Sequence, residues 1–345
     1  MEQVRHSFSE RVLRDMGSAV LVLDKKGGIV FANTPAYRML ELDENCCREG
    51  SRFQLLAKSD YNDSFNEAIF RAFCDTQKTV FNKVPYEAPS GKKYVFFMSC
   101  SYLQDEGMED HQLVITLSDE TEMEEAKRKL KESSLTFTTF LVGFCVWIIA
   151  YALWDFAGRP FRADFMTHGV ELLGIVMLLF IIGRTSLTWR DLGITTDEPW
   201  KTVRTALIVS ACAVAFFCAA KAVGRLINPN LFSPGAPFFD ISRFGLRQIL
   251  YIITAGIQEF LARSVMQGNL RRILVSKHKG VMAIVISSLI FAGLHIHLGF
   301  MFMIGAAVLA GLEGILYEKQ QNIFGVWILH WCFGVCGTLL GLVGH

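Results

Sequence analysis

The hydrophobic pattern of the chain changes near residue 134. Before that point, short apolar runs alternate with charged stretches, as in a soluble domain. From Leu135 onward the apolar runs lengthen, and seven of them reach, or nearly reach, the length that crosses a bilayer. These runs cover residues 135–154, 166–183, 203–222, 246–270, 281–300, 301–317 and 322–343. The sequence therefore predicts a soluble domain followed by an all-α polytopic membrane bundle of about seven helices, over residues 135–345.

The N-terminal part has the pattern of a small α+β domain. Its opening stretch, "AVLVLDKKGGIVFANTPAYRML", predicts a strand, a turn at Gly27 and Gly28, a second strand and a helix capped by Asn33. The later stretches "KKYVFFMSCSYL" and "HQLVITLSD" predict two more strands, and residues 64–74 predict a short helix between the strand pairs. We expect these strands to form an antiparallel sheet.

This arrangement resembles a PAS sensor domain, over residues 10–120. The matching stretches are "VLVLDKKGGIVFANTPAYRML" at the start and "VITLSDETEMEEAKRKL" at the end. The second stretch resembles the way in which such domains continue into a signalling helix, expected here over residues 119–134. The resemblance implies either a ligand cavity between sheet and helices or a fold used only for pairing.

No ligand of the PAS-like domain can be assigned. His6 and His111 lie in polar segments, where a solvated side chain is a simpler reading than a haem ligand. Cys46 and Cys47 could react with a flavin or an oxidant, but most unpaired cysteines are packing residues. The nine cysteines include no CxxC pair, which argues against a disulfide framework and fits a reducing compartment.

The predicted linker helix has a short apolar repeat. Met123, Ala126, Leu130 and Ser133 follow a/d-like spacing, but a single heptad is too short to establish a coiled coil. Two readings stay open: a solvated linker, or a homodimer that pairs through the PAS-like domain and this helix.

Charged and polar residues inside the apolar runs indicate a site. A charge at mid-bilayer costs roughly 2.5–3.5 kcal/mol, so it should face the bundle interior and have a partner. Glu259 and Arg263 lie four residues apart and can pair on one helix face. His295 and His330 lie on two other predicted helices, and we expect both to converge on Glu259. A carboxylate and two imidazoles in a dry cavity can activate water and stabilise an oxyanion.

Three short motifs resemble those of the CPBP family, also called the Abi or CAAX-protease family of intramembrane endopeptidases. They are Gln258-Glu259-Phe260-Leu261-Ala262-Arg263, then Phe291 followed by His295, then His330 followed by Gly334. The resemblance covers about residues 170–343. It implies hydrolysis of a peptide bond in a membrane-associated protein or peptide. By the same resemblance His295 activates water, His330 is an oxyanion donor, and Glu259 with Arg263 supports the site.

Two positions depart from the family pattern. Gln258 stands where the family has its first glutamate, and Gly334 stands where it has an asparagine. A glutamine cannot take a proton from water, and the loss of one oxyanion donor costs roughly 3–4 kcal/mol of barrier. Either Glu259 takes over as the base, or the protein is a catalytically inactive membrane sensor or scaffold. Glu313 lies outside the motifs and is either a compensating acid or a partner for another polar group.

A metal-dependent site and a transporter are two further alternatives for the polar residues in the apolar runs. Glu259, His295 and His330 would make a zinc-type ligand set, so a divalent metal stays open as a cofactor. A transporter would need polar groups along a path through the membrane, whereas the polar groups here cluster.

Charge distribution bears on location and partners. The 34 Lys and Arg residues nearly balance the 33 Asp and Glu residues, so no strong field favours nucleic acid. Residues 1–15 are polar and lack the apolar core of a signal peptide. Basic residues gather at 127–131, just before the first apolar run. With this pairing of domains, we expect an integral protein of the bacterial inner membrane whose PAS-like domain is cytosolic.

Overall fold

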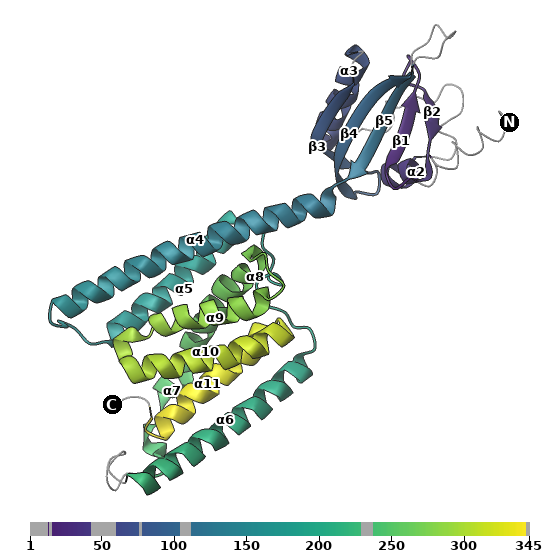
Figure 1. Cartoon of the computed structure of the whole chain (residues 1–345). Coiled ribbons are helices and arrows are strands. Elements are labelled where there is room, and N and C mark those ends of the chain that lie inside the picture. Colours follow the sequence, from purple (N-terminus) through teal and green to yellow (C-terminus); the bar gives the residue numbers. More distant parts are fainter. Residues whose placement is uncertain are drawn as a thin grey trace. The chain divides into compact units, whose positions relative to one another are not determined.

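The computed structural model describes residues 13, 16–42, 60–75, 78–103, 112–228 and 237–342. Contacts within the chain separate two compact units, Met1–Arg128 and Lys129–His345 (Figure 1). The alternatives raised for His6, Cys46, Cys47 and His111 fall outside the described residues.

The first unit contains a five-stranded antiparallel sheet with strand order β2-β1-β5-β4-β3. Its strands are β1 (Ala19–Leu23), β2 (Ile29–Ala32), β3 (Thr79–Glu87), β4 (Lys93–Leu103) and β5 (Gln112–Asp119). Four of them are predicted by the sequence, and β3 is not. The β3 strand carries Pro85 and a register shift between Phe81 and Val84, and it lies at the sheet edge, where proline is tolerated.

One hydrophobic core joins the sheet to the helices α2 (Thr34–Leu40) and α3 (Asp63–Cys74). Burial alternates along β4 and β5, so that every second side chain faces this core. The Phe65 ring of α3 lies 4.7 Å from the Tyr86 ring of β3, measured between centroids. Asn33 caps α2 as predicted, because its side-chain oxygen accepts a hydrogen bond from the backbone N–H of Ala36.

The predicted linker helix and the first apolar run form one continuous helix, α4 (Thr121–Phe156). Asp119 accepts hydrogen bonds from the backbone and side chain of Thr121, which caps the helix start. Glu124 then forms ion pairs with Lys83 of β3 at 2.7 Å and with Lys127 at 2.9 Å.

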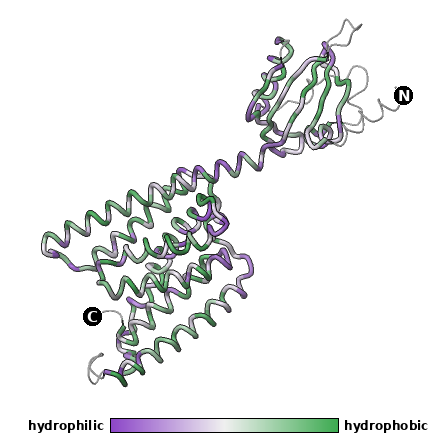
Figure 2. Tube along the Cα trace, in the orientation of Figure 1, coloured by the Kyte–Doolittle hydropathy of each residue, from purple (hydrophilic) through white to green (hydrophobic). Residues whose placement is uncertain are grey.

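The second unit is mostly helical. Beyond α4, its helices are α5 (Asp164–Arg184), α6 (Pro199–Ile227), α7 (Leu246–Glu259), α8 (Asn269–Ile273), α9 (Lys279–Gly293), α10 (Phe300–Gln320) and α11 (Ile323–Leu339). Figure 2 shows long hydrophobic stretches along these helices.

Four helical segments are long and apolar enough to cross a membrane: Thr121–Phe156, Phe165–Arg184, Pro199–Ile227 and Leu246–Ile273. The α9 and α11 helices are apolar but shorter. The expected count of seven spans is therefore not confirmed.

The segment Leu246–Ile273 is not a uniform α-helix. Between α7 and α8 it forms a π-helix, η5 (Phe260–Gly268), and all nine of its residues are buried. The π-helix contacts α5, α9, α10 and α11, which explains this burial. Such segments are rare and often occur at functional sites.

Candidate functional site

A buried ion pair lies where α7 passes into the π-helix. Glu259 and Arg263 are fully buried, and the Nε atom of Arg263 lies 2.8 Å from Oε2 of Glu259. The four-residue spacing therefore brings the two side chains together, as the sequence predicts.

The remaining donors of Arg263 reach other elements. Its Nη1 donates to Oε1 of Gln267 at 2.9 Å. Its Nη2 donates to the carbonyl oxygen of Ala310 at 3.1 Å and lies 3.4 Å from Oε2 of Glu313. Glu313 is fully buried on α10, so the guanidinium joins two carboxylates from different helices. Glu313 thus belongs to this cluster, although its position outside the motifs left its role open.

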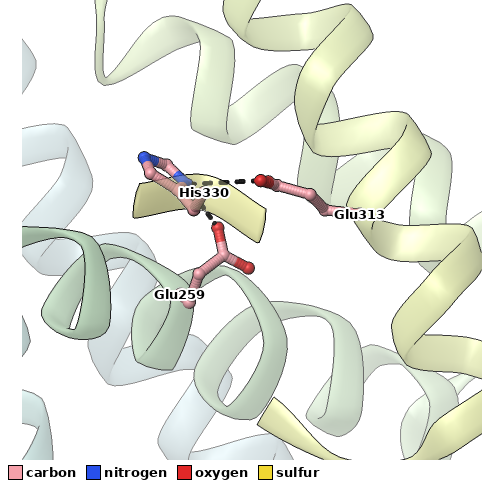
Figure 3. A group of neighbouring side chains, drawn as sticks. All are labelled: Glu259, Glu313 and His330. Atoms are coloured by element: carbon pink, nitrogen blue, oxygen red, sulfur yellow. Dashed lines mark hydrogen bonds and ion pairs between the residues drawn. The ribbon is translucent and has the colours of Figure 1, made fainter. Parts of the chain in front are cut away.

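His330 of α11 completes the cluster. Its Nδ1 atom lies 2.8 Å from Oε1 of Glu259 and 3.6 Å from Oε1 of Glu313. Dashed lines in Figure 3 mark these two interactions. Because a carboxylate can only accept, Nδ1 carries a proton and donates it to Glu259. Two carboxylates face one guanidinium, so a protonated imidazole at His330 makes the cluster neutral overall. A buried group of charges is tolerated only when it is paired in this way.

The other nitrogen of His330 is also engaged. Its Nε2 atom lies 2.9 Å from the hydroxyl oxygen of Tyr251, on α7. Tyr251 precedes Glu259 by eight residues, or about two helical turns, so both side chains lie on one face of the helix. The sequence motifs do not include Tyr251. The signal that could have found it is this spacing from Glu259.

The hydrogen bond of His295 goes to a backbone carbonyl rather than to the ion-pair cluster. His295 follows the end of α9 and is 7% exposed. Its Nδ1 atom lies 2.8 Å from the carbonyl oxygen of Phe291, which can only accept, so Nδ1 carries the proton. The Nε2 atom of the neutral ring therefore has a free lone pair.

Phe291 lies beside both histidines. The centroid of its ring is 4.6 Å from that of His295 and 6.0 Å from that of His330. The two histidines thus share a neighbour, but the hydrogen bonds of His295 place it next to Phe291, whereas His330 contacts Glu259 directly. Direct contact with Glu259 is therefore shown for His330, and the convergence of His295 on the same site stays a prediction.

The group with metal-ligand spacing also differs from the one expected. Within the described residues, ligand atoms of Glu259, Glu313 and His330 lie within 4.8 Å of one another, so Glu313 stands in the place foreseen for His295. Both carboxylates already interact with Arg263. A divalent cation would have to compete with this fixed guanidinium, which favours a site that works without metal.

The two departures from the family pattern have different surroundings. Gln258 is 5% exposed, and its Oε1 atom has no hydrogen-bond partner among the described residues. At Gly334, a Cβ atom would lie 2.8 Å from Cζ and 3.0 Å from Cδ1 of Tyr251, and closer still to Cε1. The Tyr251 ring therefore fills the space that a larger residue at 334 would need.

The other intramembrane histidines form separate contacts. His297 is buried, and its Nε2 atom lies 2.9 Å from Oγ1 of Thr167. His168 pairs with Glu171 at 2.9 Å, and Glu171 accepts a hydrogen bond from Thr254.

A comparison with protein families agrees with the resemblance of the three motifs. Residues 242–336, which include all three motifs, match the family model described as type II CAAX prenyl endopeptidase Rce1-like. This family is membrane-embedded. None of the curated proteins matches the chain.

Solved structures that match the N-terminal part include PAS and LOV domains. A PAS domain from a two-component sensor histidine kinase is 17% identical, with a TM-score of 0.26, over 34% of this chain and 99% of that one. A LOV protein from Rhodobacter sphaeroides is 17% identical, with a TM-score of 0.29, over 39% and 80%. The PAS domain of the fruit-fly ELK potassium channel is 11% identical, with a TM-score of 0.28, over 34% and 97%. Residues 242–336 are thus similar to the Rce1-like, CAAX protease type, family, and the structural neighbours of the N-terminal third are PAS and LOV domains.

Proposed function

We propose that this protein is an intramembrane endopeptidase that hydrolyses a peptide bond of a membrane-associated protein or peptide, under control of its PAS-like domain. The observation that carries the proposal is the buried cluster of Glu259, Arg263, Glu313 and His330, with the neutral imidazole of His295 beside the shared Phe291 ring. The match of residues 242–336 to the Rce1-like family supports the same reaction class.

His295 is the base of the proposed reaction. The carbonyl of Phe291 fixes its tautomer, so that Nε2 can take a proton from water as the water attacks the scissile carbonyl. This role does not need a carboxylate at position 258. Gln258 can accept a hydrogen bond from water but cannot remove its proton. In this mechanism the departure at 258 leaves the base in place.

The ion-pair cluster supplies a fixed positive field. Arg263 and the protonated His330 lie between the carboxylates, and their positions are set by hydrogen bonds from three helices before substrate binds. Charge that is oriented in advance stabilises a developing oxyanion without the cost of reorganisation. The role of Glu259 is to orient His330 rather than to act as the base.

Cleavage by the purified protein tests the proposal. The protein is reconstituted in lipid nanodiscs and incubated with a panel of peptides tethered by a lipid or by a single apolar helix. We expect cleavage products in mass spectra, and we expect a chelator to leave the rate unchanged because Arg263 already occupies the carboxylates. A wild-type protein that cleaves no member of the panel contradicts the proposal.

The inactive-member alternative rests on the departures at Gln258 and Gly334. It predicts that wild type is silent and that Gln258→Glu creates cleavage. Equal rates for wild type and Gln258→Glu would count against it.

Regulation is proposed to pass along α4 and the loop between α5 and α6. Near its start, α4 is tied to the sheet: the Thr121 hydroxyl accepts from the backbone of Val95, and Glu124 pairs with Lys83. Further along, Lys129 pairs with Asp191 at 3.0 Å, and Glu132 accepts from Ser186. The helix therefore contacts both the sheet and the loop.

The same loop contacts the site helix. The carbonyl oxygen of Leu192 accepts from the hydroxyl of Ser264, the neighbour of Arg263, at 2.5 Å. Arg272 donates to the carbonyl oxygen of Asp191. Burial opposes ionisation of Asp191, but hydrogen bonds from Thr188 and Lys129 outweigh it and lower the pKa of this carboxyl. At neutral pH the Asp191 carboxylate is therefore charged and available to Lys129.

Insertions in α4 test this connection. One alanine inserted after Arg128 turns the two groups of α4 contacts by about 100° relative to one another, whereas seven inserted residues return them to within about 20°. We expect the single insertion to change the basal cleavage rate several-fold and the seven-residue insertion to restore it. Identical rates for wild type and both insertions would show that α4 transmits nothing.

Location and assembly follow the same proposal. We propose a bacterial inner membrane protein with a cytosolic PAS-like domain, consistent with the basic residues near the start of the first apolar run. Pairing of two chains through this domain and α4 is also proposed.

A further inference from the structure

We propose that the hydroxyl of Tyr251 is the hydrogen-bond donor to the scissile carbonyl oxygen, so that His330 acts on the substrate through Tyr251. This inference rests on the proposed peptidase function. It assigns a catalytic role to a residue outside the three motifs.

His330 has hydrogen-bond partners on both sides of its ring. Both of its ring nitrogens have partners: Nδ1 lies 2.8 Å from Glu259, and Nε2 lies 2.9 Å from the Tyr251 hydroxyl. The imidazole therefore has no N–H left with which to contact a substrate oxygen. A direct role for His330 as oxyanion donor would require the contact with Tyr251 to break.

The direction of the hydrogen bond between His330 and Tyr251 decides where the phenol proton can point. With a doubly protonated imidazole at His330 balancing the second carboxylate, Nε2 donates to the phenol oxygen at 2.9 Å. The phenol proton then cannot point back at the imidazole and is free to be donated elsewhere. A phenol that accepts from a cation is a stronger donor, because hydrogen bonds in a chain polarise one another.

The Tyr251 ring packs directly against the backbone at Gly334. The Tyr251 ring occupies the volume that any side chain at 334 would need, since a Cβ there would lie 2.8 Å from Cζ. The two positions lie on neighbouring helices, α7 and α11, that pack together. The absence of a side chain at 334 is therefore what allows the phenol to reach His330. The Tyr251 hydroxyl thus takes the place of the asparagine amide that the family pattern has at position 334.

The chemistry needs no transfer of the phenol proton. As water attacks the carbonyl carbon, His295 takes the water proton and the carbonyl oxygen gains negative charge. The Tyr251 O–H bond to that oxygen shortens, and the positive charge on His330 lies directly behind it. When the tetrahedral intermediate collapses, the leaving nitrogen receives the proton held by His295.

Tyr251→Phe removes the hydroxyl and keeps the ring. In nanodiscs, on a tethered peptide that wild type cleaves, we expect kcat to fall about 10²–10³-fold, with KM nearly unchanged. The melting temperature should fall modestly, because the Nε2–H of His330 loses its acceptor, and the rates are compared at a temperature where both proteins are folded. Trp327→Phe is the matched control, because it removes an aromatic hydrogen bond between the same two helices, from Trp327 Nε1 to the carbonyl of Ile252. The control should retain wild-type kcat, and a wild-type kcat in Tyr251→Phe would overturn the inference.

A swap of the two positions gives a second test. Gly334→Asn alone should be impaired, because the new side chain collides with the Tyr251 ring. In Tyr251→Ala the space is open, and adding Gly334→Asn supplies an amide N–H from the other helix. We expect the double variant to be at least about tenfold faster than Tyr251→Ala. A double variant no faster than Tyr251→Ala contradicts the donor role.

Binding of a tetrahedral phosphinate peptide separates this inference from the proposed function. Wild type should bind the phosphinate more tightly than the matched amide, and Tyr251→Phe should lose most of that difference. This preference in a wild type that does not cleave would preserve the donor role and reject hydrolysis. Cleavage by wild type without the preference would reject the donor role alone.

Discussion

His295→Ala is expected to abolish peptide cleavage, with a loss of about 10³-fold or more in kcat. Positioned general-base catalysis contributes about 10²–10⁴-fold, and no carboxylate at 258 is present to replace it. The structural reason is the tautomer: the Phe291 carbonyl holds the proton on Nδ1 and leaves Nε2 as the acceptor. Rates on a tethered peptide, measured at enzyme excess, give the chemical step directly.

Two variants separate the base from a structural role. His295→Gln keeps a side-chain donor for the Phe291 carbonyl but cannot take a proton from water, so it should fold normally and stay inactive. His168→Ala removes a histidine at the start of α5 whose side chain is 68% exposed, and it should retain activity. If His295→Gln cleaves at the wild-type rate, His295 is not the base.

Arg263→Met is expected to lower the free energy of unfolding by about 3–5 kcal/mol, which is typical when one partner of a buried ion pair is removed. The guanidinium is fully buried between Glu259 and Glu313, so its loss leaves two carboxylates facing each other with only His330 to compensate. Unfolding in mixed micelles, followed by tryptophan fluorescence, measures this change.

A second arginine on the same helical run provides the control. Arg271 pairs with Glu318 at 3.1 Å, but its side chain is 37% exposed. Exposed pairs contribute only about 0–1 kcal/mol, so Arg271→Met should have a small effect. Adding Glu313→Gln to Arg263→Met should recover part of the lost stability because it removes one of the two facing charges. Equal losses for Arg263→Met and Arg271→Met would show that burial of the cluster is not what makes Arg263 important.

Contacts within one helix could be predicted from the sequence, and contacts between helices mostly could not. The pairing of Glu259 with Arg263 follows from a spacing of four residues. Hydropathy placed Glu313 and His330 on separate apolar helices, but the rotation of each helix about its axis depends on packing across the whole bundle. For that reason the sequence does not assign Glu313 to the site, and it does not predict that His330 rather than His295 bonds to Glu259.

The N-terminal domain follows the same rule. The β1 and β2 strands and the cap at Asn33 follow from local turn and capping chemistry. The sequence does not predict β3, because Pro85 and the bulge after Phe81 break the alternating pattern, and its pairing with β4 makes it a strand. Turn and capping residues therefore predict β1, β2 and the start of α2, whereas β3 depends on pairing with another strand.

The fit of the Tyr251 ring over Gly334 also constrains how this site can evolve. A lineage that acquires a side chain at 334 before position 251 becomes small must pass through a sterically blocked intermediate. The reverse order is open, because a small residue at 251 only leaves a gap. The two positions should therefore show strong sign epistasis, and ancestral sequences should have changed position 251 first whenever the pair was exchanged.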